Sequence, residues 1–70
     1  MHLEPVPRAS KNIKATCLDQ GDGMVYIQFQ NDDVYRYNMP AEIYHDMLMA
    51  ESIGEYFNKH VRKVYPGVKL

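Results

Sequence analysis

Residues 52 to 58 carry side chains that could bind an anion. Ser52 and Gly54 lie at the start of an expected helix, whose free backbone amides and positive dipole end favour a phosphate or carboxylate. Gly54 would let such a group approach the backbone closely, and Asn58 follows one turn later. The structural alternative is a capping box, because residues 52 to 55 have the S-x-x-E pattern. Gly54 would then permit tight packing, and Asn58 would bond to a loop.

Three cations continue the same segment. Lys59, Arg62 and Lys63 would lie in the last turns of the expected helix, where they could contact the phosphates of a nucleotide or nucleic acid. Basic residues are also common at solvated helix ends, because cations complement the negative end of the helix dipole. Both interpretations remain open at this point.

A second candidate surface combines an aromatic ring with a guanidinium group. Tyr26 and Arg36 are expected on neighbouring strands, on the face of the sheet that points away from the core. A surface of this kind suits protein partners and single-stranded bases alike. In the structural alternative, Arg36 pairs with an acidic neighbour across the sheet or in the N-terminal segment.

Several other chemistries lack the residues they need. Cys17 is the single cysteine, so an intrachain disulfide and a Cys/His zinc framework are excluded. No local motif pairs a nucleophile with a base, and repeated-glycine phosphate loops are absent. We therefore expect no enzyme, no metal site and no cofactor.

Length and charge narrow the possible partners. The chain has 70 residues and a formal net charge of −1, so it forms one domain with no overall attraction for phosphate backbones. It lacks an apolar run of signal-peptide or membrane-span length, and with a lone cysteine we expect a cytoplasmic protein with no membrane contact. A core this small favours self-association.

Alternating apolar residues predict three strands at about residues 12 to 18, 24 to 30 and 33 to 38. A three-residue loop between the first two would place Cys17 opposite Val25, with both on the core side. A three-residue loop after the second would place Phe29 opposite Tyr35 and keep the charge of Arg36 off the core.

Helical spacing of apolar residues follows the strands. Pro40 suits a first helical turn and Asn38 can cap it, which predicts a helix over residues 40 to 49. A second helix is predicted over residues 53 to 64. Its apolar stripe includes His60, for which we expect a hydrogen-bonded place in the core.

This order of motifs resembles the KTSC domain family. The matching residues are Ser10, Ile13, Val34-Tyr35-Arg36-Tyr37, Pro40, Tyr44, Ala50, Ser52, Gly54, Tyr56-Phe57-Asn58 and Tyr65-Pro66. The chain departs from the usual pattern at Asn38-Met39, where glycine-valine is usual, and at Ile53, where a lysine is common. The resemblance implies a small module, found at the C-terminus of some lysyl-tRNA synthetases and as standalone bacterial or phage proteins, without an established activity.

Together these patterns predict an α+β domain, in which a three-stranded antiparallel β-meander is followed by two helices on one face. Residues 11 to 66 form the domain, between a flexible arm at 1 to 10 and a tail at 67 to 70. The expected core is Ile13, Ala15, Val25, Ile27, Phe29, Tyr37, Ile43, Met47, Leu48, Tyr56, Phe57 and Val61.

Two functional hypotheses follow. The first is a non-catalytic interaction module that binds a protein partner or itself through Tyr26 and Arg36. The second is a binder of nucleic acid, a nucleotide or another anion through Ser52, Gly54 and Asn58, with the basic residues beside them.

Overall fold

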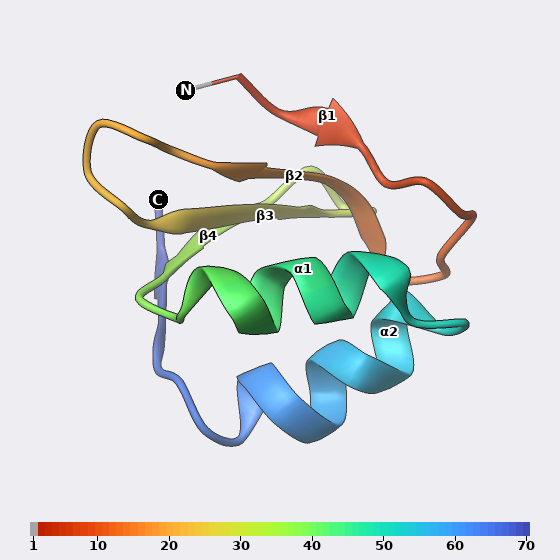
Figure 1. Cartoon of the computed structure of the whole chain (residues 1–70). Helices are drawn as coiled ribbons and strands as arrows, with labels where there is room; N and C mark the ends of the chain where they lie inside the picture. Colours follow the sequence, from red (N-terminus) through yellow and green to blue (C-terminus); the bar gives the residue numbers. More distant parts are fainter. Residues whose placement is uncertain (1) are drawn as a thin grey trace.

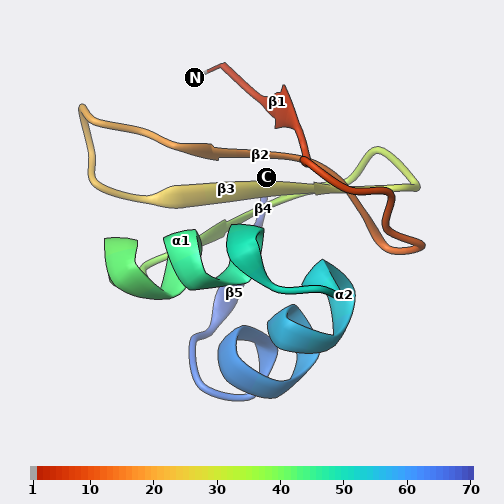
Figure 2. The same cartoon turned by 45° about the vertical axis from the view of Figure 1, so that its right-hand side comes forward.

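The computed structural model describes residues 2–70 as one sheet with helices packed on one of its faces (Figures 1 and 2). Within these residues the sheet has five antiparallel strands, in the order β1-β2-β3-β4-β5. The expected α+β class is therefore confirmed, and the expected limit of three strands is wrong. The elements are β1 (Glu4–Pro5), β2 (Ile13–Leu18), β3 (Val25–Phe29), β4 (Val34–Tyr37), α1 (Ala41–Met49), α2 (Ile53–Tyr56), the π-helical segment η1 (Phe57–Arg62) and β5 (Gly67–Lys69).

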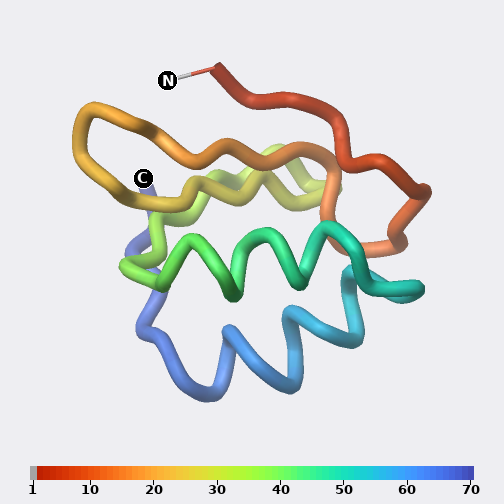
Figure 3. The backbone as a smooth tube through the Cα atoms, in the orientation of Figure 1, coloured from red at the N-terminus to blue at the C-terminus, as the bar shows by residue number. Residues whose placement is uncertain are grey.

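The two additional strands lie in the segments predicted to be an arm and a tail. β1 pairs with β2 at one edge of the sheet, and Pro5 is tolerated there because an edge strand leaves one row of amides unpaired. After η1 the chain returns to the sheet, where β5 pairs with β4 (Figure 3). Neither strand shows in the sequence pattern, because each is too short for a two-residue alternation to emerge.

A bulge changes the predicted register between β2 and β3. Ile13 lies opposite Phe29, but the pairing shifts between Ile13 and Ala15, so that Thr16 lies opposite Ile27. The extra residue at the bulge places Thr16 on the core side, where the alternation had predicted Ala15 and Cys17. Cys17 consequently lies opposite Tyr26, and its predicted place on the core face opposite Val25 is wrong.

Between β3 and β4 the predicted face is right and the register is displaced by two residues. Tyr35 lies opposite Ile27 instead of Phe29, which keeps its ring on the core side. The chain turns at residues 30 to 32, where the Phe29 amide donates to the Asp33 carbonyl over 2.9 Å. Asp32 has φ of 72°, a left-handed conformation that Asp adopts more readily than most residues. Because a shift of two preserves the alternation, Arg36 remains off the core face.

The first helix begins one residue later than predicted and is capped differently. Pro40 precedes Ala41 as the cap residue, and within the described chain no side chain caps this end, so the predicted cap by Asn38 is wrong. At the other end Arg8 donates from Nη1 to the Leu48 and Ala50 carbonyls, at 3.1 and 2.9 Å. The N-terminal segment therefore contributes directly to the end of α1.

The second helix begins as predicted and then widens. The Ser52 hydroxyl accepts the Glu55 amide at 3.3 Å, which confirms this half of the capping box. From Phe57 the turns are π-helical, and the segment ends at Arg62. In this π-helical segment His60 is exposed beside the ring of Tyr56, so its predicted place in the core is wrong.

Ten buried residues form the core between the sheet and the helices. They are Ile13, Val25, Ile27, Tyr37, Met39, Tyr44, Met47, Ile53, Phe57 and Val61. Phe29, Ile43, Leu48 and Tyr56 were predicted to be core residues and pack against this cluster only partly buried. Ala15 is buried but does not belong to the cluster, as the bulge requires.

Candidate binding pocket

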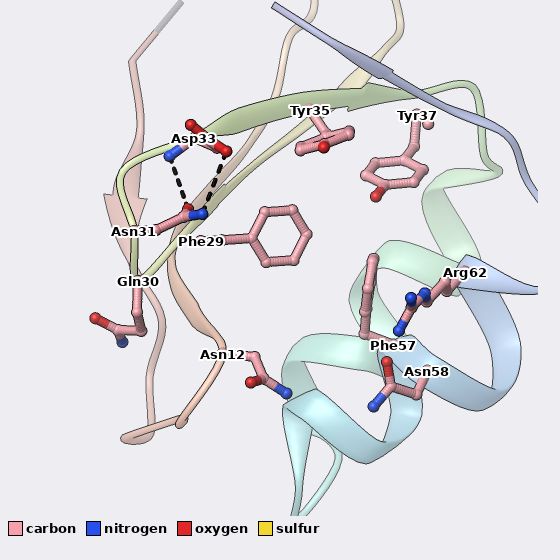
Figure 4. Close-up of a pocket in the computed structure, with 11 residues that line it drawn as sticks. Asn12, Phe29, Gln30, Asn31, Asp33, Tyr35, Tyr37, Phe57, Asn58 and Arg62 are labelled. Carbon is pink, nitrogen blue, oxygen red and sulfur yellow. Dashed lines mark hydrogen bonds between the residues drawn. The ribbon is translucent and has the colours of Figure 1, made fainter.

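A pocket of about 650 Å³ lies between the core face of the sheet and η1. Figure 4 shows side chains from β3, β4, η1 and the connecting loops converging on it. The lining residues are Asn12, Phe29, Gln30, Asn31, Asp33, Tyr35, Tyr37, Phe57, Asn58, Arg62 and Gly67. This volume falls in the range of small-molecule sites, roughly 300 to 1,000 Å³.

Aromatic rings make the apolar part of the pocket. Phe57 contacts Phe29 and Tyr37 edge to face, with ring centroids 5.5 and 5.6 Å apart. Tyr35 meets Phe29 in the same way at 5.5 Å and lies nearly parallel to Tyr37 at 6.5 Å. Edge-to-face contacts of this kind fix ring orientations. Tyr37 and Phe57 are buried, whereas Phe29 and Tyr35 retain exposed surface that a ligand can cover.

The η1 side of the pocket supplies a cation and an amide. Asn58 and Arg62 are one turn apart and reach toward the rings from the same segment (Figure 4). Within residues 2–70 neither side chain has a hydrogen-bond partner, and Arg62 has no ion pair. Burial raises the pKa of Tyr37, and the nearby charge of Tyr35 acts in the same direction while Arg62 opposes it. The guanidinium group is thus close enough to influence the pocket.

The opposite side of the pocket is occupied by internal bonds. Asn31 donates to the Asp33 carboxylate at 3.2 Å and accepts the Asp33 amide at 3.0 Å. The Lys69 Nζ atom lies 3.4 Å from the same carboxylate, so the negative charge of Asp33 is already paired. Gln30 donates to the Ser10 and Ile13 carbonyls. This side therefore offers few free polar groups.

The structure divides the predicted anion site into two unequal parts. Half-buried Asn58 and exposed Arg62 line the pocket, whereas Lys59 and Lys63 are exposed outside it. Ser52 acts as a helix cap.

Gly54, the remaining member of that site, is half-buried beside the N-terminal segment. A Cβ atom at this glycine would lie 3.5 Å from both the Asn12 and Ser10 side chains. The N-terminal segment therefore packs beside the helix start that was a candidate to receive an anion.

Tyr26 and Arg36 lie on neighbouring strands, as expected, and the displaced register places them directly opposite each other; they are less exposed than expected. Tyr26 is 8% exposed, and its hydroxyl donates to the Asp22 carboxylate. This bond lowers the pKa of Asp22 and raises the pKa of Tyr26. Arg36 is half-buried between Tyr26 and Val68, and it lowers the pKa of Asp22 further by its charge.

Sequence reasoning missed Phe29, Tyr35 and Asn12 as pocket residues. Phe29 was assigned to the core on its alternation, and the same pattern would describe a ring that is only half covered. Asn12 approaches the pocket through a fold of the N-terminal segment that alternation does not encode.

Other kinds of site were also sought. Across residues 2–70, no three His, Cys, Asp or Glu side chains are grouped to hold a metal ion. Over the same residues, no helix has both the length and the apolar composition needed to cross a membrane.

Comparison with family models decides the relationship suggested by the sequence. The KTSC domain model matches residues 9–65, most of the chain. The chain belongs to the KTSC domain family. A search of curated proteins found no match.

A solved KTSC domain protein has the same fold. The crystal structure of a KTSC domain protein from Yersinia pestis is similar to this one with a TM-score of 0.85 and 23% sequence identity. The similarity covers 99% of this chain and 96% of the other. At this identity the likeness concerns the fold alone.

Proposed function

We propose that this KTSC domain is a small non-catalytic interaction module and that the pocket between β4 and η1 is its binding site. The pocket combines half-covered rings with polar groups that lack partners within the described chain. Binding sites are typically concave and largely apolar, with a few convergent polar groups. This combination distinguishes the pocket from the start of α2, where Gly54 packs beside the Asn12 and Ser10 side chains.

One observation carries the proposal: Arg62 and Asn58 extend beside the rings without a hydrogen bond to any of residues 2–70. Asn58 is half-buried and Arg62 is exposed, so both keep donors that a ligand in the pocket can reach. A ligand that presents an acceptor to these groups would satisfy them. In the free protein, Arg62 lies in the last turn of η1, where its charge also complements the helix dipole.

An NMR titration with benzoate and indole tests the proposal. We expect both compounds to shift the amides of residues 29 to 35 and 57 to 62, because these segments line the pocket. Tyr35→Leu removes a lining ring and should weaken the shifts, whereas Tyr56→Leu removes a ring outside the lining and should leave them. Shifts scattered over the surface, or equal losses in the two variants, would contradict a binding pocket.

Binding of a protein partner or a second copy is a second candidate function. It is favoured by the face of the sheet that carries no helix, where Tyr26, Arg36 and Val68 are neighbours (Figure 2). Val68 is 48% exposed, and its strand forms an edge of the sheet. An exposed edge with apolar side chains is suited to pairing with another chain.

Light scattering over a concentration series tests self-association. An oligomer that dissociates in Val68→Asp and persists in Lys11→Asp would support this face, since Lys11 is exposed outside every strand. For a different protein partner, binding should show the same dependence on the two variants. A wild-type chain that is monomeric at every concentration excludes the second copy as partner.

For the nucleic-acid or nucleotide alternative, the candidate site moves from the start of α2 to the pocket. Of its predicted helix-start residues, Ser52 caps α2 and Gly54 packs beside the N-terminal segment, while Asn58 and Arg62 lie at the pocket. The pocket is therefore the place at which this alternative is best tested.

A further inference from the structure

We propose that the pocket takes a nucleoside phosphate, with its base against Phe29 and Tyr35 and its phosphate at Arg62 and Asn58. This inference rests on the proposed function of the pocket and adds the chemical class of its ligand. The shared chemistry is a flat ring joined to a phosphate, which a free nucleotide and the 5′ end of a single-stranded nucleic acid both possess.

The rings supply a surface of the right kind for a base. Phe29 and Tyr35 are the lining rings that keep exposed area, and Phe57 contacts Phe29 edge to face at a centroid distance of 5.5 Å. Bases stack on aromatic side chains without regard to sequence, because every base has a π face. Rings already fixed by their neighbours lose little freedom when a base covers them.

The charge near η1 favours an anion. Residues 57 to 70 contain four Lys or Arg residues and no Asp or Glu. Lys69 is compensated by Asp33 at 3.4 Å, and Arg62 is the uncompensated cation that lines the pocket. A guanidinium group binds phosphate oxygens through paired donors. The adjacent Asn58 amide offers a further donor to the same group.

The hydrogen bonds already made by the lining residues predict weak selectivity among bases. A base is identified by hydrogen bonds to its edge, yet Asn31 and Gln30 already donate within the protein. Asn12 is the lining amide on that side whose side chain has no partner among residues 2–70. We therefore expect the phosphate and the ring to determine affinity, and the base edge to contribute little.

A peptide that ends in an aromatic residue would present a similar ring and a carboxylate. A phosphate monoester carries up to two negative charges and three terminal oxygens, and so engages Arg62 and Asn58 together. The observations favour the phosphate because a single carboxylate would leave more of these donors unused. Tighter binding of such a peptide than of a nucleotide would overturn the inference.

Calorimetric titration of the full chain with adenosine 5′-monophosphate, adenosine and inorganic phosphate tests the inference. We expect the nucleotide to bind about tenfold or more tightly than either fragment, because one charge-assisted bond accounts for a factor of this size. Uridine 5′-monophosphate should bind within about threefold of the adenosine compound, since few edge contacts are free. A tetranucleotide with and without a 5′ phosphate then distinguishes a free nucleotide from a chain end.

Arg62→Gln and Lys63→Gln form a matched pair of charge-removing variants. Arg62 lines the pocket and Lys63, the next residue, does not, so a specific site predicts about a tenfold loss for Arg62→Gln and under about twofold for Lys63→Gln. Adenosine should bind Arg62→Gln as it binds the parent chain. Equal losses in the two variants would reduce the interaction to nonspecific charge attraction and overturn the inference.

The two proposals fail in different ways. If benzoate and indole shift the pocket amides while the nucleotide binds no better than adenosine, the ligand class is wrong and the pocket remains a binding site. If none of these compounds shifts the pocket amides, both proposals are overturned.

Discussion

Gly67 lies directly against the ring of Tyr37. A Cβ atom at residue 67 would stand 2.7 Å from Cε2, 2.8 Å from Cζ and 2.9 Å from the hydroxyl oxygen of this tyrosine. Tyr37 is 5% exposed and is held by Phe57, so its ring has little room to yield. The missing side chain at Gly67 therefore allows β5 to pair with β4 at the pocket.

Gly67→Ala should destabilise the chain by about 1 to 3 kcal/mol, because an added methyl group overpacks a buried ring. Chemical denaturation measures this loss. Hydrogen exchange at the Leu70 amide, which donates to the Val34 carbonyl at 2.9 Å, reports whether β5 separates. Val68→Ala is the control in the same strand, because its side chain is 48% exposed and should cost under about 0.5 kcal/mol. Full stability in Gly67→Ala would contradict the close packing.

The bulge in β2 creates a buried hydrogen bond that can be tested by a double-mutant cycle. Thr16 Oγ1 lies 3.0 Å from the Tyr44 hydroxyl, and Thr16 is 3% exposed. Thr16→Val should cost about 1 to 3 kcal/mol, because it leaves the tyrosine hydroxyl without its partner. Thr16→Val with Tyr44→Phe should cost less than the sum of the single changes. Additive losses would show that the two groups are not coupled.

Tyr44 also predicts a pH dependence. Burial raises the pKa of its hydroxyl, and the hydrogen bond with Thr16 opposes this effect. Because the folded state holds the proton more tightly, its contribution to stability is complete below the ordinary tyrosine pKa of about 10 and is lost as pH rises above it. Tyr44→Phe should flatten part of this decline in unfolding free energy. An unchanged alkaline slope would contradict the assignment to Tyr44.

Arg8 provides a test of the N-terminal segment. Its two hydrogen bonds to carbonyls at the end of α1 should make Arg8→Ala less stable by about 1 kcal/mol, a modest value because the side chain is exposed. Lys11→Ala removes a nearby exposed cation and should have less effect. If Arg8→Ala and Lys11→Ala lost equal amounts of stability, the positive charge and not the two hydrogen bonds would account for the contribution of Arg8.

The sequence predicted those elements of the fold whose apolar residues follow a regular period. Two-residue alternation identified β2, β3 and β4, and the 3.6-residue period identified both helices, because each pattern extends over several residues. The bulge near Lys14 and the displaced turn at Asp32 each depend on one local backbone choice, which periodicity does not record. The edge strands depend on contacts between distant segments. Their stability comes from pairing and not from their own composition.

The candidate site shows the same division. Asn58 and Arg62 were identified by residue type and helical spacing, and both line the pocket. Tyr35 was expected to pack on the core side, and its half-covered ring became visible only with the position of η1. Gly54 was a candidate ligand contact because a glycine near a helix start suggests backbone access, with tight packing as the alternative. The contact with Asn12 gives it a packing role instead.

Gly54→Ala separates this packing role from the anion site first expected. A Cβ at this position would meet the Asn12 and Ser10 side chains at 3.5 Å, an ordinary contact, and alanine favours a helix over glycine by up to about 1 kcal/mol. The variant should therefore be as stable as the parent or slightly more stable in chemical denaturation. Its binding of adenosine 5′-monophosphate should be unchanged, because residue 54 does not line the pocket. Lost nucleotide binding with intact stability would restore the start of α2 as the anion site, since a methyl group there would obstruct only a ligand bound at that backbone.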